Sequence, residues 1–120
     1  MDIRSLFKKT KEAKKFKAGK TICQEGTPGD TMYVVLDGEL EVSAGGKLIE
    51  VAKPGDVVGE MALIDTKSRS ATVVAKTDCK LVPLNEKRFL VLVHETPIFA
   101  LLVMRTMADR LRRMIAARGS

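Results

Sequence analysis

The chain of 120 residues is 45% hydrophobic and 30% charged, which indicates one globular domain large enough to bury a core without disulfides or metals. Its two cysteines, Cys23 and Cys79, stand far apart in apolar runs and its N-terminus is charged throughout, so we expect reduced thiols, a cytoplasmic location and no secretory leader. The longest apolar run, Ile98 to Met104, is too short to span a bilayer, so no membrane partner is expected.

The N-terminal segment carries much of the positive charge. The net charge is +6 over residues 1–20, −4 over residues 21–97 and +4 over residues 98–120. Residues 1–18 are predicted to form a helical segment from Asp2 to about Lys15, with Ile3, Leu6 and Phe7 packed inward. A nucleic-acid partner is one interpretation of its lysines, but they lack interleaved aromatic residues, so we expect a solvated face instead.

Residues 19–84 show the pattern of an antiparallel β protein. Turn signals such as Asp37-Gly38 and Gly45-Gly46 recur between short β-rich runs, and these two suit tight hairpins. Pro83 suggests that its run is an edge strand or a strand end. The predicted strands are Met32–Leu36, Glu39–Ser43, Lys47–Ala52, Thr72–Ala75 and Cys79–Leu84.

Residues 85–118 are predicted to form two helices. Asn85 suits the N-cap of a helix over Glu86–His94, and Thr96-Pro97 suits the start of a longer helix from Ile98 to about Arg118. These elements together predict one domain over residues 1–120, a mainly β protein in which an antiparallel β jelly roll is flanked by helices. The final helix carries an apolar stripe that is either a coiled-coil seam, which would give a homodimer, or a face packed on the sheets: Leu101, Met104, Ala108, Leu111 and Ile115.

The most informative motif lies at residues 58–72. Gly59 permits close backbone approach, and the helical turn that begins at Glu60 presents free N–H groups that suit an anion. Arg69 offers a planar fork that binds two phosphate oxygens at once, and Glu60 suits a ribose hydroxyl. The alternative is a surface arginine that closes a turn with Glu60 as its ion-pair partner.

This G-E-x-A-L … R-S-A pattern resembles the phosphate-binding cassette of the cyclic nucleotide-binding domain family. The resemblance extends over roughly residues 5–115, through Gly19-Lys20-Thr21-Ile22, Glu25-Gly26, Gly29-Asp30, Met32–Gly38 and Pro54-Gly55-Asp56. It implies a jelly roll that binds cAMP, or cGMP, and moves its C-terminal helices on binding.

The resemblance also implies roles for individual residues. Arg69 and Ser70 would bind the cyclic phosphate, and Glu60 the ribose 2′-hydroxyl. Gly59, Ala71 and the amides near Met61 and Ala62 would add backbone contacts. Leu63, with Phe89 and Leu92, would relay occupancy to the helices. The final helix would cover the purine, with Arg110, Arg113 and Met114 as candidate base contacts.

Other classes of function have weaker support in the sequence. His94 is the only histidine, too few for a cupin-type metal site, and no set of catalytic residues is evident, so we expect neither a metal, a cofactor nor an enzyme. The alternatives that remain are a protein-interaction domain whose pocket switches nothing and the sensor half of a truncated transcription regulator. In each case a protein effector would carry the output.

Overall fold

The computed structural model describes residues 3–65 and 68–119. Within these ranges, eight strands form two four-stranded antiparallel sheets, in the orders β1-β8-β3-β6 and β2-β7-β4-β5. This arrangement confirms the expected jelly roll. The strands are β1 (Lys14–Phe16), β2 (Thr21–Cys23), β3 (Thr31–Asp37), β4 (Leu40–Ala44), β5 (Lys47–Ala52), β6 (Val57–Val58), β7 (Thr72–Ala75) and β8 (Cys79–Asn85).

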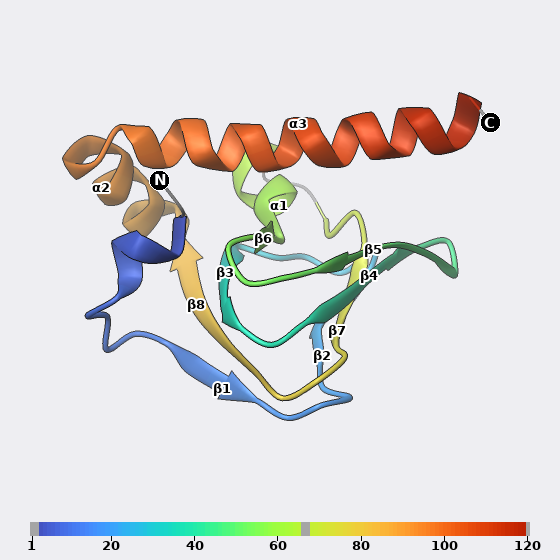
Figure 1. Ribbon diagram of the computed structural model, residues 1–120, viewed down its shortest axis with the longest axis horizontal. Helices are drawn as coiled ribbons and strands as arrows, with labels where there is room; N and C mark the ends of the chain where they lie inside the picture. Colours follow the sequence, from blue (N-terminus) through green and yellow to red (C-terminus); the bar gives the residue numbers. More distant parts are fainter. Residues whose placement is uncertain (1–2, 66–67, 120) are drawn as a thin grey trace.

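The helices lie along one side of the two sheets (Figure 1). They are a 3-10 helix η1 (Ile3–Phe7), α1 (Glu60–Asp65), α2 (Glu86–Glu95) and α3 (Ile98–Gly119). The side chain of Asn85 accepts a hydrogen bond from the amide of Arg88 at 2.8 Å, which confirms the predicted N-cap of α2. Helix α1 lies between α3 and the strands, so α3 extends along the end of the jelly roll at which the candidate cassette is found.

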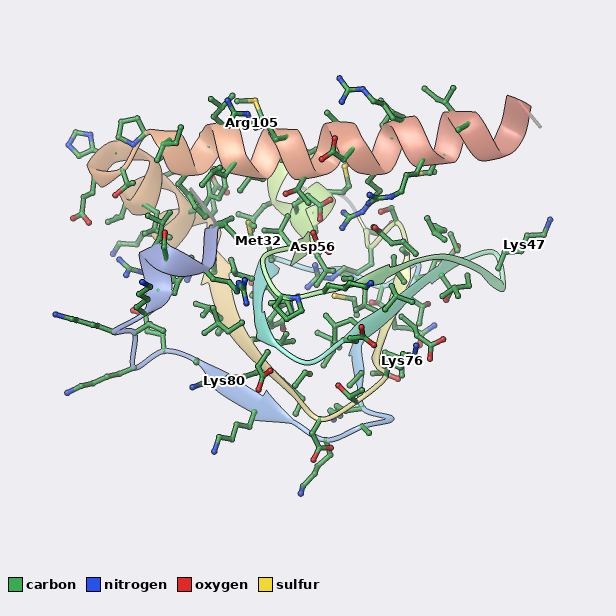
Figure 2. The ribbon with its side chains drawn as sticks, viewed as in Figure 1. Met32, Lys47, Asp56, Lys76, Lys80 and Arg105 are labelled. Atoms are coloured by element: carbon green, nitrogen blue, oxygen red, sulfur yellow. The ribbon has the colours of Figure 1, made fainter. Side chains whose placement is uncertain are left out.

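Two apolar cores explain why the strand β3 is almost wholly hydrophobic. Val35 belongs to the core between the two sheets, whereas Met32 and Val34 belong to the core between the first sheet and the helices. Strand β8 divides in the same way, with Leu81 in one core and Val82 in the other, because successive side chains of a strand point to opposite faces. Figure 2 shows Met32 on the helix side of the sheet.

The N-terminal segment differs from the predicted helix. Only η1 is helical, and Lys14–Phe16 forms the edge strand β1, paired with Cys79–Leu81 of β8. The ring of Phe16 packs against Tyr33 at a centroid separation of 6.4 Å, so strand pairing and aromatic packing prevail over local helix propensity here. Met1 and Asp2, where the helix was expected to begin, lie outside the described residues.

Pro83 is tolerated for a reason that only the sheet order reveals. Strand β8 is not an edge strand, since β1 and β3 flank it. However, β1 pairs only as far as Leu81, and Pro83 therefore has a neighbouring strand on one side alone, opposite Tyr33 of β3. The missing N–H of proline costs no ladder hydrogen bond at an unpaired edge.

Two of the exposed basic residues, Lys80 and Arg105, lie on different faces of the molecule. Figure 2 shows Lys80 and Arg105 projecting from opposite sides of the molecule, Lys80 from the sheets and Arg105 from the outer side of α3. Over residues 3–65 and 68–119, no single helix has the length and hydropathy to cross a membrane. Helices α2 and α3 meet that test only as a pair bent by 117°.

Candidate functional site

The arginine of the cassette is held in place by hydrogen bonds from its side chain and its backbone. Arg69 is only 9% exposed, and its Nη1 donates hydrogen bonds to the carbonyl oxygens of Thr31 at 2.7 Å and Gly59 at 3.1 Å. Its backbone is fixed as well, because its amide donates to the carbonyl of Thr27 at 2.8 Å and its carbonyl accepts from Gly26 at 2.9 Å. With Nη1 bound to the protein, the guanidinium's other nitrogens, Nε and Nη2, form the edge suited to an anion.

Two glycines leave room for this guanidinium. Gly59 has a φ of +76°, and a Cβ added there would lie 2.7 Å from Nη1 of Arg69. Gly29 has no left-handed backbone, so its need for glycine is steric: an added Cβ would lie 2.8 Å from Cδ of Arg69 and closer still to Nε and Cζ. The Gly29 position is therefore part of the arginine's cradle.

If the ligand is the cyclic nucleotide that the cassette resemblance implies, Gly29→Ala should weaken its binding by about tenfold or more, because the new methyl group displaces the Arg69 guanidinium. The backbone at Gly29 accommodates alanine, but displacement of Arg69 breaks its bonds to the Thr31 and Gly59 carbonyls, so the unfolding temperature should fall as well. The affinity for cAMP, measured by calorimetry, tests this. In an Arg69→Ala background the same substitution should have no further effect, and an equal loss in both backgrounds would show that Gly29 does not act through Arg69.

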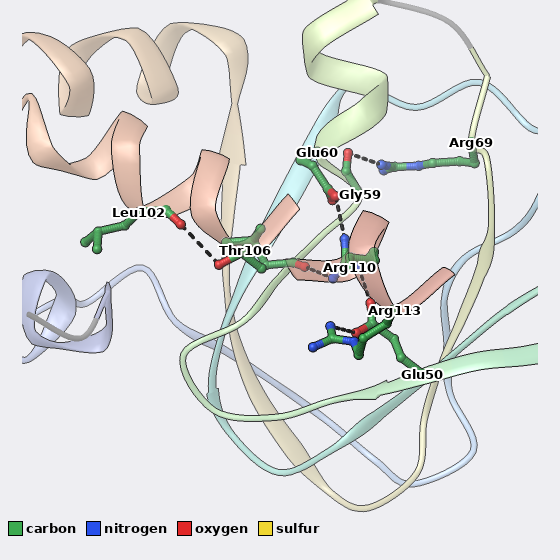
Figure 3. A network of polar contacts seen from close by, with 9 residues as sticks. Glu50, Gly59, Glu60, Arg69, Leu102, Thr106, Arg110 and Arg113 are labelled. Carbon is green, nitrogen blue, oxygen red and sulfur yellow. Dashed lines mark hydrogen bonds and ion pairs between the residues drawn. The ribbon is translucent and has the colours of Figure 1, made fainter. Parts of the chain in front are cut away.

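The carboxylate of Glu60 is bound by a residue of α3. Arg110 donates from Nη1 to Oε1 of Glu60 at 2.5 Å, from Nη2 to the carbonyl of Val57 at 2.7 Å, and from Nε to Glu50 (Figure 3). Arg113 adds a bond to the other oxygen of Glu50 at 2.6 Å. The network is largely buried, with side chains 14%, 7% and 6% exposed for Arg110, Glu50 and Glu60. It joins α3 to the cassette and to β5.

Burial dominates the electrostatics of Glu60. Loss of solvation raises the pKa of its carboxyl group above the ordinary value of 4.5, and the nearby Glu50 carboxylate adds to the rise. The Arg110 guanidinium opposes both effects and lowers the pKa. Because Arg110 uses one oxygen of Glu60 and a carboxylate has about four acceptor positions, Glu60 retains the capacity to accept from a ligand hydroxyl.

A cavity of about 670 Å³ lies between the cassette, the second sheet and α3, a volume typical of small-molecule sites. Nine of the ten expected ligand-binding residues line it: Gly59, Glu60, Met61, Ala62, Arg69, Ser70, Ala71, Arg110 and Met114. The tenth, Arg113, does not line the described cavity and binds Glu50 instead. Arg110 reaches the cavity, but its three nitrogens bind protein groups, so it differs from the expected free base contact.

The expected relay residues lie together in the helix-side core. Leu63 and Leu92 are 9% and 7% exposed, and Phe89 packs edge to face on Phe99 at 5.5 Å. Three members of the apolar stripe of α3, Met104, Ala108 and Leu111, line the cavity, whereas Leu101 and Ile115 do not. Exposure does not separate the two groups, since Met104 and Leu111 are 56% and 57% exposed and Leu101 and Ile115 are 39% and 60% exposed. The coiled-coil seam and the packed face therefore both stay predictions.

Several site residues were not predicted. Glu50, Val57 and Thr31 are bonded to the two cavity arginines, and no local motif marks them, because their roles depend on strands that meet only in the fold. Glu60 pairs with Arg110, so the ion pair with Arg69 considered above is not the one observed. Thr66 and Lys67 of the cassette lie outside the described residues. In the part of the chain that the structure describes, no cluster of three or more histidine, cysteine or acidic side chains could hold a metal ion.

Comparison with known proteins agrees with this geometry. The sequence profile described as "Cyclic nucleotide-binding domain" matches residues 13–96. A cAMP-dependent protein kinase regulatory subunit of Aspergillus niger is 42% identical over 80 residues, which cover 65% of this chain and 20% of that protein. The cGMP-dependent protein kinase egl-4 of Caenorhabditis elegans is 42% identical over 73 residues, 61% of this chain and 9% of that protein.

The solved structure of cAMP-bound PfPKA-R superimposes with a TM-score of 0.74 at 30% identity, covering 88% of this chain and 36% of that one. The chain therefore belongs to the cyclic nucleotide-binding domain family. It spans a fifth or less of the length of the two curated relatives.

Proposed function

We propose that this chain is a regulatory receptor module for a purine 3′,5′-cyclic monophosphate, with cAMP bound at least as well as cGMP, and that binding alters the position of α3. One observation carries the proposal. A single cavity brings together a buried arginine, a buried carboxylate and an apolar lining supplied partly by α3.

Each part of the cavity suits one part of the ligand. The Nε and Nη2 edge of Arg69, beside Ser70 and Ala71, suits the equatorial oxygens of a cyclic phosphate. Glu60, the first residue of α1, suits the 2′-hydroxyl of the attached ribose. The cavity continues away from both groups between β4 and α3, and this apolar part suits a purine.

Helix α3 is the element that a ligand would affect most directly. It supplies one wall of the cavity and, through Arg110, the bond to Glu60. A ligand shifts a conformational equilibrium only through contacts that differ between the two states. A ligand that contacts both Glu60 and the α3 wall makes such contacts, and Leu63 and Leu92 connect the cassette to α2 and α3 through one core.

The burial of Arg69 argues against one alternative, the protein-interaction domain. A protein-interaction domain with a non-switching pocket would have no need for a buried charge at Arg69 beside an apolar cavity, because desolvation of a charge without a ligand is costly. The output of the module would pass to a protein effector, either in another part of a longer chain or in a separate subunit. The exposed Leu101 and Ile115 of α3 offer apolar contacts for that effector or for a second copy of the chain.

The sugar contact provides the sharpest test. We expect cAMP to bind and 2′-deoxy-cAMP to bind at least about tenfold more weakly, roughly 1.5 kcal/mol, because Glu60 loses the hydroxyl that donates to it. Calorimetric titration measures both affinities. Glu60→Gln should lose much of this discrimination, whereas Glu41→Gln, the same change at an exposed position of β4, should retain it. Equal affinity of the wild type for the two ligands would exclude the proposed role of Glu60.

A further inference from the structure

The part of the cavity opposite the cassette is lined by thioether and aliphatic side chains. Four of the six methionines of the chain line this one cavity, three of them from α3. The wall from the sheets is equally apolar. The lining residues of this part, called the apolar subsite below, are Val42, Ala44, Ile49, Val73, Met104, Met107, Ala108, Leu111 and Met114.

The polar side chains of the cavity are already committed elsewhere. The guanidinium of Arg110 has each of its nitrogens bonded to Glu60, Glu50 or the Val57 carbonyl. Arg69 and Ser70 belong to the cassette end. Cys23 is 3% exposed, and burial raises the pKa of its thiol, so it stays neutral and behaves as an apolar group. Among the described lining residues, none offers an uncommitted side-chain donor or acceptor within the apolar subsite.

We propose that the apolar subsite selects the base of the cyclic nucleotide by its polarity rather than by a hydrogen-bond pattern, so that affinity rises as the purine carries fewer polar exocyclic groups. This inference rests on the proposed function, since it assigns the base to this end of the cavity. It makes Met104, Met107 and Met114 the residues that determine which base is bound.

The physical reason is the cost of desolvation. A polar group that leaves water without gaining a new hydrogen bond weakens binding, and each such group adds to the cost. Guanine carries an exocyclic carbonyl and an exocyclic amino group, adenine carries one amino group, and unsubstituted purine carries neither. Thioethers contribute dispersion contacts of similar strength to all three rings, because the side chain is polarisable and adapts its shape. The difference between bases therefore comes from solvation.

A ligand series that varies only the base tests the proposal, because the phosphate and ribose contacts stay constant. We expect the 3′,5′-cyclic monophosphate of unsubstituted purine riboside to bind at least as tightly as cAMP, and cGMP to bind about tenfold more weakly than cAMP. Calorimetry or competition with a fluorescent cAMP analogue measures each affinity. Absence of binding by every member of the series would overturn the proposed function itself. Equal binding of cAMP and cGMP, or weaker binding of the purine analogue than of cAMP, would overturn only the present inference. Tighter binding of cGMP than of cAMP would overturn it together with the base preference stated in the proposed function, but not the cyclic nucleotide site.

Two substitutions in α3 test whether the apolar subsite determines the ratio of cAMP to cGMP affinity. Met114→Gln places an amide of similar size in the apolar subsite, which can pair with either base. We expect it to narrow the ratio of cAMP to cGMP affinity by about threefold or more, because guanine has two exocyclic polar groups that lack partners in the wild type and adenine has one. Leu101→Gln makes a comparable change on the exposed part of α3, outside the cavity, and should leave the ratio unchanged. An unchanged ratio in Met114→Gln would overturn the assignment. So would a wild type that prefers cGMP and loses that preference in Ser70→Ala, because the serine hydroxyl would then select the base.

Discussion

Arg69→Ala is expected to weaken the binding of cyclic nucleotide by roughly thirtyfold or more, since removing one partner of a desolvated charge pair costs about 2–5 kcal/mol. The arginine is already buried and oriented by the carbonyls of Thr31 and Gly59 before a ligand arrives, so little further ordering opposes the contact. Arg69→Lys should restore only part of the affinity, because an ammonium group lacks the planar fork. Titration calorimetry with cAMP measures these differences.

The control for Arg69→Ala must separate the loss of a contact in the cavity from the loss of one positive charge. Arg105 lies exposed on the outer side of α3, and Arg105→Ala removes the same charge from the chain without touching the cavity (Figure 2). That variant should bind cAMP as the wild type does. Circular dichroism should show that Arg69→Ala remains folded. If the folded Arg69→Ala protein binds cAMP as tightly as the wild type does, Arg69 is not the phosphate ligand.

The sequence predicted those parts of the fold that depend on local patterns. The alternation in Glu39–Ser43, the Asn85 cap and the hairpin at Gly45-Gly46 have physical causes within a few residues, and the structure confirms each of them: β4 spans Leu40–Ala44 and pairs with β5 across the two glycines. The hairpin expected at Asp37-Gly38 was wrong, because the strands that this turn joins, β3 and β4, belong to different sheets. The prediction of a helix up to about Lys15 was wrong because strand β1 forms there through pairing with β8, more than sixty residues away. Local composition favoured a helix there, and tertiary packing decided otherwise.

The candidate site shows the same division. The cassette residues lie close in the sequence and form a motif, so they were found. The structure places seven of them around one cavity: Gly59, Glu60, Met61, Ala62, Arg69, Ser70 and Ala71. The partners that hold them were not found. Arg110 and Glu60 are fifty residues apart, and Arg110 and Glu50 sixty, so no periodicity links them. A single charged residue in a strand or helix gives no indication of which distant charge it meets.

The bond between Arg110 and Glu60 leads to the second large expected effect. We expect Arg110→Gln to lower the free energy of unfolding by about 3 kcal/mol at pH 8, because Glu50 and Glu60 would then face one another in a buried site without their shared cation. Arg113→Gln is the matched control. Arg113 also bonds Glu50, but its side chain is 57% exposed, and its loss should change stability little.

The loss of stability in Arg110→Gln should be larger at high pH than at low pH. Burial already raises the pKa of Glu60, and removing Arg110, which opposes this, raises it further. A carboxyl group with a higher pKa in the folded state than in the unfolded state makes the folded protein bind more protons between the two values, so stability falls as pH rises through that range. The free energy of unfolding of Arg110→Gln, measured with denaturant, should therefore be closer to that of the wild type at pH 5 than at pH 8. A deficit that is constant with pH would show that Glu60 does not titrate as proposed.

The same variant tests whether α3 responds to the ligand. In the wild type, we expect saturating cAMP to slow amide hydrogen exchange in α3, because the ligand adds contacts to the helix that Arg110 already ties to the cassette. In Arg110→Gln, exchange over the half of α3 beyond residue 107 should be faster without ligand, because that half loses its bonds to Glu60, Glu50 and the Val57 carbonyl. Added cAMP should then slow exchange by a larger factor than in the wild type, since the ligand alone would hold the helix in place. If exchange in α3 is the same with and without bound cAMP in both proteins, the cavity is a static binding site and the helix is not the element that reports occupancy.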